Sequence, residues 1–135
     1  MLSKLAVTKE DDMKVGFIGL GNVGGKLAGS LLRNGYDLTV RDLEPALAEP
    51  FLAQGAHWAE SAADLAEAVD RVVTCLPSPA ACSAVMEGED GVLEAMAPGK
   101  IWAEMSTTDA DEKARLAKLV QAKGAAAIEC PVTGG

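Results

Sequence analysis

The sequence predicts a single α/β domain built on a parallel sheet, and three observations predict it. Short runs rich in β-branched residues alternate with longer segments of helical periodicity, which is typical of repeated β-α-β units. The 135 residues are about the length of one domain. A content of 49% hydrophobic and 24% charged residues is ordinary for a globular protein, so we expect little disorder.

The expected strands follow one another along the chain, with helical segments between them. Each is a short apolar run bounded by glycine, proline or charged residues. We predict strands at 13–18, 37–41, 71–76, 100–104 and 125–129, with a further short one near 56–58.

The helical segments are marked by apolar stripes and by capping residues. A stripe that runs from Val23 to Leu31 indicates a helix, and Gly35 is placed to end it. Ser61 and Ser78 each precede a helical pattern, as N-caps do, and they predict the starts of two more helices.

A last helix is expected to begin after Thr108 or Asp109 and to end at Gly124. Its small and apolar residues would face the core, and its lysines would face water. We assign Ala110, Ala114, Ala117 and Val120 to the inward face, and Lys113, Lys118 and Lys123 to the solvated face.

The charge of the chain argues against two classes of partner. The formal net charge is −8, and the 12 basic residues are scattered along the sequence. Because nucleic acid and anionic membranes attract clustered Lys and Arg, we expect the protein to bind neither. Residues 1–12 contain no apolar run of signal-peptide length, and we expect them to form a flexible leader before a domain at 13–135.

The three cysteines predict no metal site and no disulfide framework. Cys75, Cys82 and Cys130 show no metal-like spacing. We interpret them as reduced, buried thiols of a cytoplasmic protein.

A glycine-rich turn joins the first strand to the first helix. The segment Gly19-Leu20-Gly21-Asn22-Val23-Gly24 has the G-x-G-x-x-G pattern in the strand–turn–helix setting that dinucleotide binding requires. The first glycine permits the turn, the second lets the backbone approach a pyrophosphate, and the third lets the helix pack closely. The helix N-terminus then presents free N–H groups to the anion. The pattern predicts a Rossmann-type, doubly wound sheet.

An acidic residue follows at the expected distance. Asp42 ends the second strand, eighteen positions after Gly24, close to the spacing of about 20 at which a carboxylate binds the adenosine ribose hydroxyls. This carboxylate would repel the 2′-phosphate of NADP. Neighbouring Arg41 could attract that phosphate, although adjacent strand side chains point to opposite faces. We therefore expect NAD rather than NADP, with Leu43 beside the same site.

Four segments of the chain stand out: FIGLGNVGGKLAGSL at 17–31, TCLP at 74–77, EMST at 104–107 and ECPVTGG at 129–135. They resemble the β-hydroxyacid dehydrogenases, the family of 3-hydroxyisobutyrate dehydrogenase, tartronate semialdehyde reductase and the cofactor domain of 6-phosphogluconate dehydrogenase. They span almost the whole chain in the family's order. The resemblance implies an oxidoreductase acting with NAD on a small 3-hydroxy acid, from a parent that forms a homo-oligomer.

The resemblance also implies roles for individual residues. Leu76, Pro77 and Ala81 would line the cofactor site, and Thr107 would lie near the nicotinamide ribose. Thr133, Gly134 and Gly135 would contact substrate, with Thr133 in place of the family's serine.

The family's proton-exchanging lysine belongs to a glycine-rich helix in a mostly helical C-terminal domain. No lysine of this chain matches it, so we assign no catalytic residue here and expect the 135 residues alone to bind cofactor with negligible turnover. Two other interpretations stay open: a stand-alone NAD-sensing regulatory module, and a shortened protein that uses the fold to bind a partner.

Overall fold

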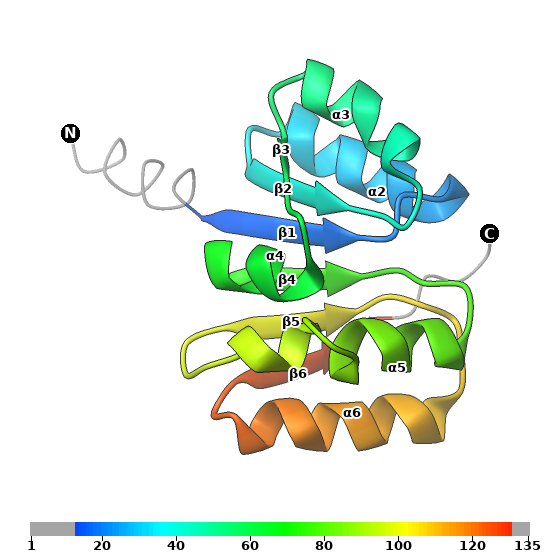
Figure 1. The fold of residues 1–135 in the computed structure, drawn as a ribbon, viewed down its shortest axis with the longest axis vertical. Helices are drawn as coiled ribbons and strands as arrows, with labels where there is room; N and C mark the ends of the chain where they lie inside the picture. Colours follow the sequence, from blue (N-terminus) through cyan, green and yellow to red (C-terminus); the bar gives the residue numbers. More distant parts are fainter. Residues whose placement is uncertain (1–12, 131–135) are drawn as a thin grey trace.

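The computed structural model describes residues 13–130, and within this range it confirms the predicted fold. Six strands form one sheet in the order β3-β2-β1-β4-β5-β6, and all neighbouring pairs are parallel. Figure 1 shows the arrows of β1, β2, β4 and β5 pointing toward the same edge. The predicted leader at 1–12 lies outside the described residues. The strands are β1 (Lys14–Ile18), β2 (Asp37–Arg41), β3 (His57–Trp58), β4 (Arg71–Thr74), β5 (Ile101–Glu104) and β6 (Ala126–Glu129).

Helices cover both faces of the sheet, because the strand order reverses at β1. One core cluster joins β1 and β2 to α2, η1 and α3, and the other joins the sheet to α4, α5, η2 and α6. The sheet is therefore doubly wound, as the sequence predicts. The helices are α2 (Asn22–Arg33), η1 (Pro45–Ala48), α3 (Glu49–Ala53), α4 (Ala62–Ala68), α5 (Pro79–Glu87), η2 (Val92–Ala95) and α6 (Ala110–Ala122).

Three helices begin at the side-chain caps that the sequence indicates. Ser61 Oγ accepts a hydrogen bond of 3.0 Å from the Asp64 N–H, and Ser78 Oγ accepts one of 3.1 Å from the Ala81 N–H. Of the two candidates before α6, Asp109 is the N-cap. Each cap satisfies one of the N–H groups that the first turn of a helix leaves without a backbone partner.

The predicted faces of α6 are confirmed in part: Val120 is buried, and Lys118 and Lys123 are exposed. The assignment is wrong at Ala110, Ala114 and Lys113. Lys113, Leu116 and Val120 are buried, whereas Ala110 and Ala114 are exposed. The buried positions follow the i, i+3, i+7 spacing of one helix face. Lys113 can belong to that face because its ammonium group donates a hydrogen bond to the carbonyl oxygen of buried Ser106. The composition of the helix does not reveal this contact with a residue outside it.

The cysteines are free thiols, as predicted, but their burial differs. Cys82 is buried and Cys75 is half-buried, whereas Cys130 is exposed just after β6. The prediction that all three are buried is therefore wrong for Cys130, which follows an edge strand whose residues are mostly exposed. Within residues 13–130 no helix combines the length and the apolar run that crossing a bilayer requires.

The packing of α2 on β1 yields a prediction about two loop glycines. A Cβ at Gly24 would lie 2.0 Å from the Gly19 carbonyl oxygen, whereas a Cβ at Gly21 would meet no atom within 4 Å. We expect Gly24→Ala to lower the free energy of unfolding by about 1–3 kcal/mol through overpacking. The matched variant Gly21→Ala should cost less than about 1 kcal/mol, because Gly21 is an exposed N-cap. Urea denaturation followed by circular dichroism measures both values, and equal stabilities would contradict the packing argument.

Candidate dinucleotide-binding site

The segments that follow β1, β2, β4 and β5 meet at the carboxyl edge of the sheet. Backbone hydrogen bonds fix them there in register: Gly19 N to Arg41 O at 3.1 Å, Cys75 N to Ile18 O at 3.0 Å, and Met105 N to Thr74 O at 2.9 Å. Ligands of open α/β sheets bind outside this edge, where the strand order reverses. The glycine turn lies at that reversal, after β1.

The glycine turn is packed against the start of α2 and against the loop after β4. Gly19 has a φ of +105°, and a Cβ there would lie 2.2 Å from the Cys75 carbonyl oxygen. Gly24 approaches Gly19 equally closely, whereas Gly21 faces open space. The absence of a side chain at Gly19 and Gly24 thus allows the turn, the start of α2 and the loop after β4 to pack closely. Gly21 leaves room for a ligand beside the backbone.

The N-terminus of α2 carries no side-chain cap. Its N-cap residue is Gly21, and its first turn contains no acidic residue. By contrast, α4, α5 and α6 are capped by Ser61, Ser78 and Asp109. The first-turn N–H groups of α2 and the positive end of its dipole are therefore available to an anion. Asn22 and Val23 are exposed at this point.

Asp42 joins the end of β2 to the glycine turn. Its Oδ2 accepts a hydrogen bond of 2.7 Å from the Leu20 N–H, and its Oδ1 accepts one of 2.9 Å from the Glu44 N–H. The carboxylate is half-buried, while Leu43 beside it is 88% exposed. Asp42 thus lies against the glycine turn, which is where a carboxylate that binds ribose hydroxyls is expected. Its hydrogen bond to the Leu20 N–H also holds the turn in place.

The Arg41 guanidinium contacts the segment at β3. Its Nη1 donates to the Ala59 carbonyl oxygen at 2.9 Å, and its Cζ lies 5.5 Å from the centroid of the Trp58 ring. Both contacts come from β3 and the residue after it, and the sequence analysis missed them. The partner of Arg41 is set by the pairing of β2 with β3, for which the sequence contains no local signal.

A buried polar cluster holds the two loops on the other side of the turn. Thr74 Oγ1 accepts a hydrogen bond from Trp102 Nε1 and donates one to Glu104 Oε2, both at 2.9 Å. Glu104 Oε1 accepts from the Ser106 N–H at 2.5 Å, and Ser106 Oγ accepts from the Leu76 N–H at 2.7 Å. The chain of bonds thus connects β4 and β5 to the loops that carry Leu76 and Thr107.

Lys113 completes this cluster from α6. Its side chain is 5% exposed, and its Nζ donates a hydrogen bond to the Ser106 carbonyl oxygen. The prediction that Lys113 faces water is therefore wrong. Because an isolated buried ammonium group is costly, the carbonyl acceptor is what allows the burial. Lys113 ties the start of α6 to the turn that carries Thr107.

The two inner cysteines are not nucleophiles in this arrangement. Burial and, secondly, the Glu104 carboxylate raise the pKa of Cys82 to about 11. The same two causes, in the same order, raise the pKa of Cys75. Both residues are therefore neutral thiols near pH 7. Cys82 packs within the core, with its Sγ 3.5 Å from Glu104 Oε2.

The predicted cofactor residues gather at one edge, on both sides of the glycine turn. Pro77 and Thr107 are exposed there, and Leu76 and Ala81 are half-buried. The predicted substrate residues Thr133, Gly134 and Gly135 lie outside the described residues.

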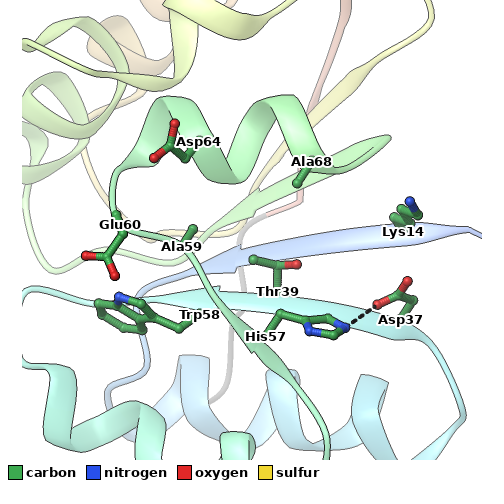
Figure 2. A pocket seen from close by; sticks show the side chains of 9 residues that line it. All are labelled: Lys14, Asp37, Thr39, His57, Trp58, Ala59, Glu60, Asp64 and Ala68. Atoms are coloured by element: carbon green, nitrogen blue, oxygen red, sulfur yellow. Dashed lines mark ion pairs between the residues drawn. The ribbon is translucent and has the colours of Figure 1, made fainter.

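A separate open hollow runs along the β2 and β3 edge beneath α4 (Figure 2). Its lining mixes acidic and basic side chains, and His57 Nε2 lies 3.4 Å from Asp37 Oδ1 within it. None of the predicted cofactor residues lines it, so the hollow is distinct from the candidate site. Its lining residues are Lys14, Asp37, Thr39, His57, Trp58, Ala59, Glu60, Asp64 and Ala68.

The family model described as the NAD binding domain of 6-phosphogluconate dehydrogenase matches residues 14–135. The chain belongs to this family. Among its relatives is mitochondrial 3-hydroxyisobutyrate dehydrogenase of Rattus norvegicus, which is 40% identical over 121 residues. This match covers 90% of the chain and 36% of the rat protein, so the chain spans about a third of that relative.

Solved structures of similar proteins have the same fold. The 3-hydroxyisobutyrate dehydrogenase of Salmonella typhimurium is 34% identical with a TM-score of 0.84, and the match covers 92% of this chain and 43% of that one. Psf3, solved in complex with NADP+ and 2-OPP, is 31% identical with a TM-score of 0.84, over 90% of this chain and 43% of that one. The chain is thus the NAD-binding domain of an oxidoreductase family that includes 3-hydroxyisobutyrate dehydrogenases.

The polar cluster yields a second prediction. Thr74→Val keeps the shape of the side chain but leaves Trp102 Nε1 and Glu104 Oε2 each without the hydroxyl that they contact. We expect it to lower the free energy of unfolding by about 2–4 kcal/mol, because two buried polar groups lose a partner. The control Thr74→Ser keeps the hydroxyl and removes one methyl group, at a cost of about 1 kcal/mol. Urea denaturation of both proteins checks this, and a Val variant as stable as the Ser variant would show that the cluster adds nothing.

Proposed function

We propose that the chain is the cofactor-binding part of an NAD-dependent oxidoreductase acting on a small 3-hydroxy acid such as 3-hydroxyisobutyrate. The observation that carries this proposal is the uncapped N-terminus of α2 directly beside Asp42. An anion-binding helix end and a ribose-binding carboxylate are the two parts that a dinucleotide requires at this edge. The relatedness to 3-hydroxyisobutyrate dehydrogenases supports the choice of substrate class.

The described residues fit the cofactor. The exposed turn at Gly21, with no atom within 4 Å of where a Cβ would be, has room for a pyrophosphate, and the first turn of α2 offers N–H donors to it. The Asp42 carboxylate, already oriented by two backbone donors, keeps lone pairs for ribose hydroxyls. Leu76, Pro77, Ala81 and Thr107 would hold the nicotinamide side. When bound, the nicotinamide supplies the acceptor for a hydride.

The surroundings of Asp42 favour NAD over NADP. A phosphate on the adenosine 2′ position would lie against the carboxylate, and like charges repel most strongly where water is partly excluded. The guanidinium of Arg41, which could offset this repulsion, is bound to β3 and the residue after it. These two features support NAD as the cofactor.

The chemistry on the substrate needs groups beyond those assigned here. Thr133, Gly134 and Gly135 are proposed to contact the substrate, with the Thr133 hydroxyl as a donor or acceptor. No residue of this chain is assigned to exchange the alcohol proton. A positioned acid–base group typically accelerates such a reaction by a factor of about 10²–10⁴. We therefore propose that the 135 residues bind the cofactor but have negligible turnover by themselves.

The turnover proposal is tested with the purified 135-residue chain. We expect no reduction of NAD above background when 3-hydroxyisobutyrate is added, as followed by absorbance of the reduced cofactor at saturating NAD. Sustained turnover would overturn the assignment of the acid–base group to other residues.

Cofactor binding yields a sharper prediction. Asp42→Asn keeps the size of the side chain and one acceptor oxygen but removes the charge that ribose hydroxyls would contact. Because hydrogen bonds to charged groups are the strong ones, we expect NAD affinity to fall by about 10- to 100-fold. Isothermal titration calorimetry measures the loss.

The matched control for this variant is Asp37→Asn. Asp37 lies at the opposite end of the same strand, away from the glycine turn. We expect this variant to bind NAD as the unmodified chain does. Equal affinities for Asp42→Asn and the unmodified chain would exclude Asp42 as a ribose ligand.

A further inference from the structure

Arg41 is adjacent in sequence to the acid proposed to bind ribose, yet its charged group is directed elsewhere. The residue ends β2, immediately before Asp42. A guanidinium at this place would suit the 2′-phosphate of NADP, since its planar fork matches phosphate oxygens. Whether the Arg41 guanidinium can reach a 2′-phosphate depends on the contacts that hold it.

Two contacts hold the guanidinium on the β3 side of the sheet. Nη1 donates to the Ala59 carbonyl oxygen at 2.9 Å, and Cζ lies 5.5 Å from the centroid of the Trp58 ring. The first is a charge-assisted hydrogen bond, and the second is a cation–π contact. Arg41 is half-buried, so water competes with these contacts less than it would at a fully exposed site.

The position of the two contact groups is fixed by strand pairing. Trp58 lies in register with Val40, and the Ala59 N–H donates to the Val40 carbonyl oxygen at 3.3 Å. The short strand β3 and the residue after it therefore place the Trp58 ring and the Ala59 carbonyl oxygen beside the end of β2. Figure 2 shows Trp58 and Ala59 adjacent on this strand and its continuation.

We propose that Trp58 and the Ala59 carbonyl are positioning groups for cofactor selection, which hold Arg41 away from the adenosine ribose so that the site takes NAD. This inference rests on the proposed function, because it presumes that the ribose lies at Asp42. Selection then has two parts: the Asp42 carboxylate repels a 2′-phosphate, and the nearby cation that could compensate is already bound. Releasing the cation should let the site accept NADP more readily.

The test compares NAD and NADP affinities by isothermal titration calorimetry at low ionic strength. Trp58→Leu keeps an apolar side chain on β3 but removes the ring under the guanidinium. We expect the affinity for NADP relative to NAD to rise by about three- to tenfold, the range that one cation–π contact represents. Trp58→Phe, which keeps a ring, should return the ratio toward that of the unmodified chain.

A second variant identifies the group responsible. In the double variant Trp58→Leu, Arg41→Gln the rise should disappear, because no guanidinium is left to reach the phosphate. A ratio unchanged in Trp58→Leu, with NAD binding intact, would overturn the inference while leaving the proposed function standing. A rise that persists without Arg41 would overturn it too. An unmodified chain that binds neither dinucleotide would overturn the proposed function, and this inference with it.

Discussion

The turn between β1 and α2 has no space for a side chain at Gly19 or Gly24, and the candidate site depends on this constraint. A Cβ at either position would lie within about 2.2 Å of a backbone carbonyl oxygen. The missing side chains let α2 begin directly at the sheet edge, and they let the loop after β4 pack on the turn. The same closeness brings the Leu20 N–H to the Asp42 carboxylate. One steric fact thus joins the ends of β1, β2 and β4 into a single site.

Features encoded by neighbouring residues could be predicted from the sequence. The six strands lie within two residues of their expected bounds, because each is a short apolar run between breakers. Ser61 and Ser78 cap helices as expected, and Asp109 is one of the two residues expected to cap α6, since a cap acts over only three residues. The glycine turn and Asp42 followed from their spacing along one β-α-β unit.

Features that depend on contacts between distant segments could not be predicted in this way. From the sequence alone Lys113 is predicted to lie at the surface, because the hydrogen bond that it donates to the Ser106 carbonyl oxygen has no sequence signal. The bonds of Thr74 to Trp102 and Glu104 require β4 and β5 to be in register, and the contact of Arg41 with Trp58 requires β2 beside β3. In each case the polar group is satisfied by a partner at least 7 positions away in sequence. Composition and periodicity carry no information about such partners.

The two tryptophans of the described chain lie on opposite sides of the glycine turn. Trp58 is half-buried on the edge strand β3, near Arg41, whereas Trp102 is 1% exposed on β5, within the polar cluster. Indole emission responds to the polarity and hydrogen bonding around each ring. The domain therefore contains two intrinsic optical reporters, one beside the proposed adenosine end of the site and one beneath its nicotinamide end. Single-tryptophan versions of the chain would show which end of a ligand has arrived, without any added label.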